Sequence, residues 1–317
     1  MQTNLSNIES FNPPAWCLNG HVHTIACSLF SHPEKPSLES VKIATGDDDF
    51  LELNVIRARQ KRPVIVLLHG LEGSANRYYI IELMKMCRAM NYSVVALNFR
   101  GCGSQLNKRR RFYHSGETND LMTVFKWTLR QFPHSSIGAV GFSLGGNALL
   151  KSLAEHGDAH PAKAAVAVSV PYDLKLGAKR IQRGFTMLYE HLFIRSMTEK
   201  LRKKREIFPD LPAFEGSSLY QFDEQVTAPL HGFKSADDYY TRCSSNQFLP
   251  NIHLPTLLIH SKADPLCPPA MIPMYTIKQN PHIDYIITRE GGHVGFRSSP
   301  PGWLNRTIAN YFAEKID

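Results

Sequence analysis

Ser143 lies in a G-x-S-x-G pattern, Gly141 to Gly145, and is the side chain whose type and position best suit nucleophilic chemistry. An apolar run from Ile137 precedes it, and a helix-forming run follows it. A strand that turns abruptly into a helix exposes the residue at the apex, and the flanking glycines leave room for the crowded backbone. The helix N-terminus behind it offers N–H groups to a developing oxyanion. The competing interpretation is a turn whose serine only caps the helix.

A serine hydroxyl becomes nucleophilic when a histidine, itself oriented by an acid, removes its proton. His293 follows the last predicted strand in a glycine-containing loop, and Asp264 follows the predicted strand over residues 256–261. The resulting chain order, Ser143, Asp264, His293, is the one that accompanies a nucleophile elbow. Asp173 is the rival acid. Asp264 could instead be a turn residue before proline, and His293 an ordinary loop histidine.

An oxyanion hole needs two N–H donors, one from the residue after the nucleophile and one from the loop after an early strand. Leu144 is the candidate for the first donor. Leu71, which follows His69 and Gly70, is the candidate for the second. His69 could pass for a second base, but we expect it to stabilise the loop through a hydrogen bond.

Hydrophobic periodicity predicts the elements that must position these residues. Alternating segments at 40–44 and 51–56 predict an antiparallel hairpin. Continuous apolar runs predict strands buried on both faces, at residues 63–68, 93–99, 137–142, 164–170, 256–261 and 283–289. Helices are predicted over residues 76–90, 115–132 with Ser115 as the N-cap, 144–155, 269–279 and 303–314. Strands that alternate with helices predict an α/β fold with a mostly parallel central sheet.

Residues 172–250 interrupt this alternation after the sixth predicted strand. We expect them to form a helical cap over one end of the sheet, with residues 1–171 and 251–317 as the core domain. Phe193, Met197 and Leu201 share one face of a predicted helix there. Four apolar cap residues either line an acyl pocket or pack the cap onto the body: Phe185, Leu188, Leu192 and Phe193.

Composition limits the class of protein. The chain has 317 residues, 43% of them hydrophobic, with no apolar run near the ~20 residues that span a bilayer and no signal-peptide pattern. Its six cysteines are scattered without a C-x-x-C pair, which predicts reduced thiols in a cytoplasmic protein. His21 and His23 have no further clustered ligands, so we expect no metal site.

The formal net charge of +8 is concentrated in the predicted cap. Ten Lys or Arg residues and only two Glu lie between Lys175 and Arg205, and residues 108–111 form a second basic run. Basic surfaces can bind nucleic acid, anionic lipid or acidic substrates. Because no nucleic-acid-binding motif accompanies the charge, we expect a solvated helix face and no nucleic-acid partner. Weak contact of the basic cap with a membrane surface stays open.

Several motifs, with those above, give the chain a family resemblance that runs nearly end to end. They are Asn19-Gly20-His21-Val22-His23-Thr24, His69-Gly70-Leu71-Glu72-Gly73, Asn98-Phe99-Arg100-Gly101-Cys102-Gly103, Tyr113-His114-Ser115-Gly116-Glu117-Thr118, Gly141 to Asn147, and Thr227-Ala228-Pro229-Leu230-His231-Gly232-Phe233. The chain resembles an α/β-hydrolase, and more specifically the YheT-like esterase branch, which is related to the lipid-acting abhydrolase-domain proteins of eukaryotes. His23-Thr24 departs from the Gln-Thr expected in relatives and lies outside the proposed chemistry.

The resemblance implies hydrolysis of carboxylic esters, of short- to medium-chain or lipid-like type, with no metal or organic cofactor. It implies no specific substrate. An acyltransferase or thioesterase with the same triad, or a non-catalytic ligand-binding homologue, is the alternative. The oligomeric state is left open.

Overall fold

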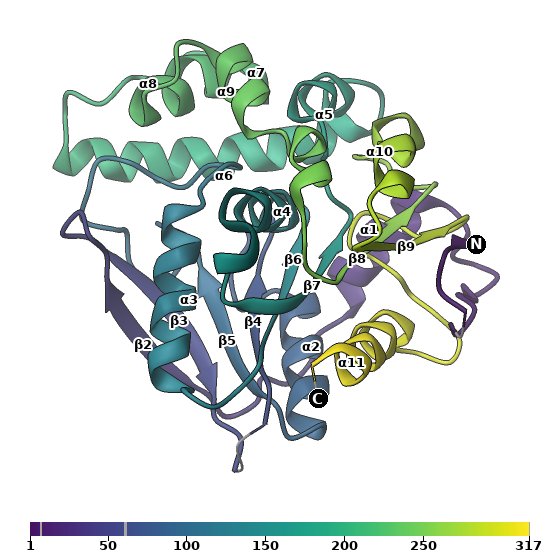
Figure 1. Cartoon of the computed structure of the whole chain (residues 1–317). Coiled ribbons are helices and arrows are strands. Elements are labelled where there is room, and N and C mark those ends of the chain that lie inside the picture. The colour runs from purple at the N-terminus through teal and green to yellow at the C-terminus, as the bar shows by residue number, and fades with distance from the viewer. Residues whose placement is uncertain (7, 60–61, 317) are drawn as a thin grey trace.

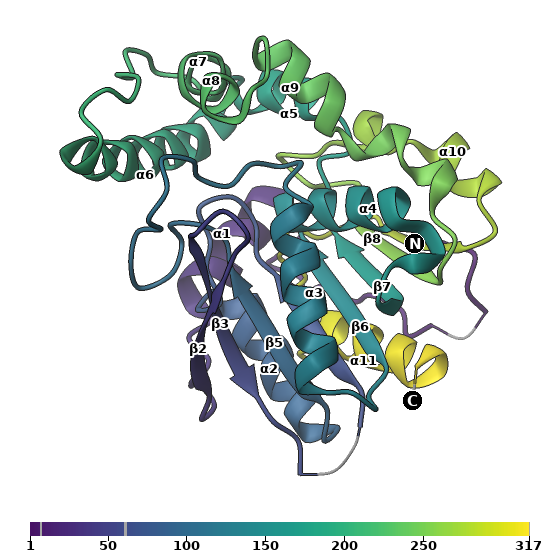
Figure 2. The same ribbon diagram turned by 60° about the vertical axis from the view of Figure 1, so that its left-hand side comes forward.

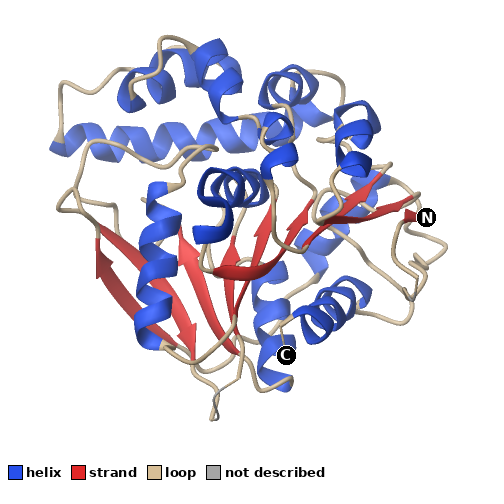
Figure 3. Ribbon diagram, in the orientation of Figure 1, coloured by secondary structure: helices blue, strands red, loops and turns tan. Residues whose placement is uncertain are grey.

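Strand β4 (Val64–Leu68) shows why the central sheet is covered on both faces. Val64, Val66 and Leu68 pack into one hydrophobic core, whereas Ile65 and Leu67 pack into a second core. Successive strand side chains point to opposite faces, so a continuous apolar run requires helices on both sides. Figure 3 shows helices on each face of the sheet.

The computed structural model describes residues 1–6, 8–59 and 62–316. Its nine-stranded sheet has the order β1-β9-β8-β7-β6-β4-β5-β3-β2 (Figure 1). The strands are β1 (Gln2–Thr3), β2 (Glu39–Ala44), β3 (Phe50–Ile56), β4 (Val64–Leu68), β5 (Ser93–Asn98), β6 (Ile137–Phe142), β7 (Ala162–Val168), β8 (Thr256–Ser261) and β9 (Ile283–Thr288). β4 to β9 pair in parallel, and β1, β2 and β3 pair antiparallel. The predicted hairpin and the mostly parallel sheet are confirmed.

Helices α3, α4 and α10 cover one core, and α2 and α11 cover the other. The helices are α1 (Gly20–Phe30), α2 (Tyr78–Ala89), α3 (Asn119–Gln131), α4 (Leu144–His156), α5 (Leu174–Ile181), α6 (Thr186–Ile207), α7 (Leu219–Phe222), α8 (Ala228–His231), α9 (Ala236–Cys243), α10 (Met274–Gln279) and α11 (Trp303–Lys315). Among the described residues, no helix is both long and apolar enough to cross a membrane.

Two features of the N-terminal half differ from the sequence prediction. Helix α3 begins at Asn119, not near Ser115, because the Glu117 carboxylate accepts hydrogen bonds from the amides of Asn119 (3.1 Å) and Asp120 (3.2 Å). The carbonyl of Ser115 instead accepts a bond from the Asn147 side chain. Helix α1 and strand β1 were not predicted, because residues 1–38 have no clear periodicity.

The segment between β7 and β8, here called the cap segment (residues 172–250), carries helices α5 to α9. β7 is the sixth predicted strand, preceded in the structure by the unpredicted β1. Figure 2 shows these helices as a layer of their own over one end of the sheet. Phe193, Met197 and Leu201 all pack against hydrophobic clusters, which confirms their shared face.

Three of the apolar cap residues that were predicted either to line a pocket or to pack against the body do not line the pocket. Phe185, Leu188 and Leu192 are exposed. Leu188 and Leu192 lie in the N-terminal half of α6, where the 3.6-residue period that turns Phe193 and Met197 toward the cavity turns these two residues toward solvent. Phe185, just before the helix, is exposed and also contacts the His21 ring of α1.

Candidate active site

Ser143 stands at the sharp turn between β6 and α4. Its backbone has φ 52° and ψ −120°, a conformation in which a non-glycine residue is strained. The turn is held because the Ser143 amide donates to the carbonyl of Val168 (2.8 Å). A Cβ on Gly145 would lie 2.5 Å from the carbonyl oxygen of His69, so only glycine fits there. The sequence pattern therefore forms a strained elbow with the serine at its apex.

Ser143, His293 and Asp264 form one hydrogen-bonded chain, although they are far apart in sequence. The Ser143 Oγ lies 2.8 Å from His293 Nε2, and His293 Nδ1 lies 3.0 Å from Asp264 Oδ2. A carboxylate only accepts, so Nδ1 carries the ring proton and Nε2 is left to accept the serine proton. Burial opposes ionisation of Asp264, but the adjacent His293 outweighs it and lowers the pKa of the carboxyl below its ordinary value.

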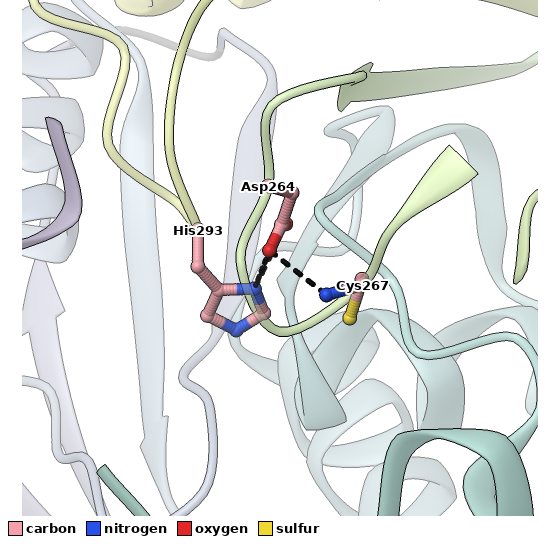
Figure 4. Close-up of side chains that lie close together, drawn as sticks. All are labelled: Asp264, Cys267 and His293. Carbon is pink, nitrogen blue, oxygen red and sulfur yellow. Dashed lines mark hydrogen bonds and ion pairs between the residues drawn. The ribbon is translucent and has the colours of Figure 1, made fainter. Parts of the chain in front are cut away.

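The loop after β8 fixes the Asp264 carboxylate. Oδ1 accepts hydrogen bonds from the amides of Leu266 (2.8 Å) and Cys267 (2.9 Å), and Figure 4 shows the carboxylate between His293 and the Cys267 amide. The rival acid, Asp173, is the N-cap of α5, and its carboxylate accepts a hydrogen bond from the Leu176 amide (2.9 Å). The geometry therefore favours Asp264.

Asp264, Cys267 and His293 are also the described residues that could together hold a metal ion, with donor atoms within 4.8 Å of one another. However, burial, reinforced by the charge of Asp264, raises the pKa of the Cys267 thiol well above its ordinary value. A protonated thiol is a poor metal ligand. The Asp264 and His293 atoms are already bonded to each other, so the cluster is better suited to proton transfer than to metal binding.

Two hydroxyl groups hold the His293 loop from either side. The His293 amide donates to Thr24 Oγ1 (2.8 Å), and the next amide, that of Val294, donates to Ser169 Oγ (3.0 Å). Thr24 is in turn fixed because its hydroxyl donates to the Gly20 carbonyl (2.8 Å). Thr24 was predicted to lie outside the chemistry. Its signal in the sequence is the motif from Asn19 to Thr24, to which no function was assigned.

The first turn of α1 therefore contacts both loops that carry the acid and the base. A Cβ on Gly20 would overlap the carbonyl oxygen of Ala263, next to Asp264. A Cβ on Gly292, next to His293, would lie 2.6 Å from Thr24 Oγ1. Glycine at these two positions is what permits the close approach.

Leu71 and Leu144, the two predicted oxyanion donors, both line the cavity at Ser143. Leu144 is the first residue of α4, where an amide has no acceptor within the helix. No acceptor among the described residues takes the Leu71 amide. A Cβ on Gly70 would lie 3.1 Å from the Cβ of Ser143, so the Leu71 loop runs close to the nucleophile.

His69 has both ring nitrogens in use. Nδ1 donates to the Gly70 carbonyl (2.7 Å), and Nε2 accepts from the Phe99 amide (3.1 Å). Burial lowers the pKa of His69 to about 4, which keeps the ring neutral. The hydrogen bond predicted to stabilise this loop is confirmed, and the ring has no nitrogen left to act as a base.

Glu72, next to Leu71, links this loop to the cap segment. It has a strained backbone (φ 51°), and its amide donates to the Tyr113 hydroxyl (2.7 Å). Its carboxylate accepts from Lys200 Nζ (2.8 Å) and Ser196 Oγ (2.6 Å), both on α6. Burial opposes ionisation of Glu72, but Lys200 outweighs it, so the pKa of this carboxyl is lowered. This pair could not be predicted from the sequence, because Glu72 and Lys200 lie in separate predicted domains.

A cavity of about 130 Å³ reaches from Ser143 and His293 into the cap segment. Its cap-side walls are mostly apolar: Leu174, Ile181, Phe193, Met197, Leu219, Phe222 and Val226. Of the four cap residues predicted as candidates for this lining, only Phe193 contributes. The lining also includes Asp223, whose pKa is raised to about 6 by burial and whose carboxyl accepts from the hydroxyls of Thr227 and Tyr240. Such a cavity suits an apolar chain.

Comparisons with known proteins agree with this geometry. A family model described as the alpha/beta hydrolase fold matches residues 63–300. The chain is 33% identical to "Putative esterase YheT" of Escherichia coli (strain K12), over 98% of this chain and 95% of that protein. It is 27% identical to "Phospholipase ABHD3" of Mus musculus, over 91% of this chain and 73% of that protein.

The fold also recurs among solved structures. The esterase Pf2001 of Pyrococcus furiosus superimposes with a TM-score of 0.62 at 19% identity, covering 90% of this chain and 100% of that one. The family model spans most of the chain, and the identity to YheT extends over nearly its whole length. The chain therefore belongs to the α/β-hydrolase family, in its YheT-like branch.

Proposed function

We propose that this α/β-hydrolase cleaves carboxylic esters through a covalent acyl-enzyme on Ser143. The observation that carries the proposal is the contact of 2.8 Å between Ser143 Oγ and His293 Nε2, at a histidine whose other nitrogen faces an ionised Asp264. A neutral imidazole in this tautomer is ready to accept the serine proton. The names of the relatives, an esterase and a phospholipase, support the same reaction class.

The reaction proceeds in two halves. His293 takes the proton of Ser143 as Oγ attacks the ester carbonyl, and the Leu71 and Leu144 amides donate to the oxyanion of the tetrahedral intermediate. Collapse of the intermediate expels the alcohol, which receives the proton from His293. Water, deprotonated by His293, then attacks the acyl-enzyme and releases the acid. Asp264 stabilises the imidazolium in both halves and keeps its own charge.

The acyl group of the substrate occupies the cavity beneath the cap segment. We assign residues 172–250 to a cap domain and residues 1–171 and 251–317 to the catalytic core, because the apolar lining on the cap side comes from α5, α6, α7 and the turn after α7, whereas the reacting groups come from the loops of the sheet. An apolar lining favours short- to medium-chain or lipid-like esters.

Labelling with a fluorophosphonate probe tests the central claim. The purified protein should form a covalent adduct, and Ser143→Ala should not. His293→Ala should label very slowly, because the serine then has no base. Turnover of a matching ester should fall on the order of ten-thousand-fold or more in both variants. Labelling of Ser143→Ala at the parental rate would place the nucleophile elsewhere.

An ester and thioester panel of graded chain length then defines the substrate class. Added alcohol separates hydrolysis from acyl transfer, because a transferase would release a new ester in place of the free acid. If no form of the protein takes up the probe, the proposal fails and a ligand-binding function replaces it.

A further inference from the structure

Exposed apolar side chains are concentrated in one region. The described residues include fifteen large hydrophobic side chains that are exposed, and nine of them lie in two short segments, residues 16–30 and 185–192. In the first segment they are Trp16, Leu18, Val22, Leu29 and Phe30, and in the second Phe185, Met187, Leu188 and Leu192. Scattered exposed apolar residues are ordinary, whereas a concentration of this kind marks an interaction surface.

The two segments lie against each other in space. The His21 ring on α1 is 4.9 Å from the Phe185 ring, and its Nδ1 lies 3.1 Å from the Tyr189 hydroxyl on α6. Val22 and Leu29 are seven residues apart on α1 and so share its exposed side, and Leu18 is exposed just before the N-cap of the helix. Together they form an apolar stripe along α1. The start of α6 extends this stripe with Phe185 (54% exposed). Residues 16–30 and residues 185–196, the N-terminal half of α6 with the residue before it, thus form one exposed apolar surface, here called the interfacial face.

The exposed charges within the two segments of the interfacial face are of one sign. Residues 16–32 contain no Asp, Glu, Lys or Arg. Residues 180–198 contain Arg180, Arg183 and Arg195, and their one acid, Glu190, is buried and accepts from the Leu219 amide (2.8 Å). Arg297 also lies over the ring of Trp16, 5.5 Å from its centroid. Exposed apolar side chains with cations beside them match a bilayer that has anionic headgroups.

The more basic C-terminal half of α6 is a weaker candidate for such contact. Arg202 pairs with Glu199 (3.0 Å) and Glu206 (2.7 Å). Lys200 pairs with Glu72, and Lys204 is buried and donates to Asn107. These three cations already have protein partners, and the C-terminal half of α6 has no apolar stripe beside them. Charge alone, the signal available in the sequence, points to the C-terminal half of α6, whereas charge together with exposed apolar side chains points to the N-terminal half.

We propose that the interfacial face binds the surface of an anionic lipid bilayer, with Phe185, Leu188, Leu192 and the α1 stripe in the interface and Arg183 and Arg195 on the headgroups. Phe193, next to Leu192 in sequence, lines the cavity at Ser143. Bilayer contact at this face would therefore bring lipid next to the wall of the acyl cavity. That consequence rests on the proposed function, but the binding itself does not.

Flotation of the full chain with vesicles tests this proposal. The protein should float with equimolar phosphatidylglycerol and phosphatidylcholine, and more weakly with phosphatidylcholine alone. Leu188→Glu with Leu192→Glu should lower the partition coefficient on the order of tenfold or more, because the bilayer would have to accommodate carboxylates. Arg183→Gln and Arg195→Gln should each cost about fivefold, and only on the anionic vesicles.

Matched controls make the same chemical changes elsewhere. Leu129→Glu with Tyr275→Glu alters two exposed apolar residues outside the face, and Lys203→Gln with Arg205→Gln removes two charges from the C-terminal half of α6. Neither pair should change flotation. Equal losses in the control pairs would overturn the proposal, as would failure of the parent protein to float.

A second readout follows Trp16, which is 59% exposed, whereas Trp303 is buried and Trp127 is partly buried against the core on α3. Brominated lipid should quench the parent protein more strongly than Trp16→Phe. Fluorophosphonate labelling in the absence of vesicles separates the two hypotheses: a protein that labels but does not float contradicts only the membrane proposal. If Leu188→Glu with Leu192→Glu instead dissociates a dimer that does not float, the face binds a second copy and the membrane proposal is wrong.

Discussion

The two halves of the candidate site are held by different parts of the molecule. On one side, the loops of Asp264 and His293 are fixed by the body, through Thr24 of α1, Ser169 after β7 and the amides that follow Asp264. On the other side, the Leu71 loop is joined to the cap segment, through the ion pair of Glu72 with Lys200 (2.8 Å).

This difference indicates how the site would respond to movement of the cap segment. The proton relay has no direct bond to α6 among the interactions of the described residues, so it would persist if α6 moved. The Leu71 loop would lose the partner of the buried Glu72 carboxylate, and an unpaired buried charge is costly. We therefore expect the relay to be preorganised and the oxyanion hole to depend on the cap, and variants on each side should fail in different ways.

The largest expected effect is on the body side. Asp264→Asn should lower turnover on the order of ten-thousand-fold, because an amide does not hold the imidazole in the tautomer that accepts the serine proton. Steady-state kinetics on an ester substrate measures this. Asp173→Asn is the matched control, since asparagine replaces aspartate well as an N-cap. A comparable loss in Asp173→Asn alone would show that the wrong acid has been assigned.

The residues of the proposed relay could be predicted because each follows an apolar strand. Ser143, Asp264 and His293 are marked by local sequence, and parallel strands bring their carboxyl ends to one edge of the sheet. Helix α1 gave no such signal: its exposed side is apolar, so the contrast between a buried and a solvated face is weak.

The contacts that support the site could not be predicted, because they depend on tertiary packing. Thr24 and His293 are 269 residues apart, and Glu72 and Lys200 are 128 residues apart. A threonine and a glutamate in such sequence contexts are compatible with many surface positions. Thr24 and Glu72 support the site only because the packing of α1 and the cap segment buries them beside it.

The second-largest loss of turnover is expected on the cap side, at the ion pair of Glu72 with Lys200. Glu72→Gln should lower turnover between about tenfold and 100-fold, below the loss expected for complete removal of one oxyanion donor. The KM for a small soluble ester should change little, because the acyl cavity is intact. Lys200→Met should cost more than Glu72→Gln, since it leaves a buried carboxylate unpaired. Lys203→Met, one turn of α6 away from the site and exposed, is the control.

The combined variant and the pH dependence sharpen this test. Glu72→Gln with Lys200→Met should lower turnover by less than the product of the two single effects, because the pair acts as a unit. If the turnover of the double variant falls by the full product of the two single losses, Glu72 and Lys200 act independently and the proposed coupling is wrong.

The pKa of Glu72 is lowered from 4.5, so its stabilising contribution is present above pH 4.5 and is lost as the pH falls through the lower folded value. The stability difference between parent and Glu72→Gln, measured by denaturant unfolding, should therefore shrink in that acidic range.

The smallest effect returns to the body side, at Thr24. Thr24→Val keeps the shape of the side chain but removes the hydroxyl that accepts the His293 amide. We expect turnover to fall about tenfold, because small displacements of a catalytic group are costly while Ser169 still holds the other side of the loop. Thr24→Ser should restore turnover, and KM and thermal stability should stay close to the parental values in both. If Thr24→Val and Thr24→Ser lose activity equally, the methyl packing matters and the hydroxyl does not. If Thr24→Val matches the parent, Ser169 alone positions His293, and the proposed contribution of α1 to the relay is wrong.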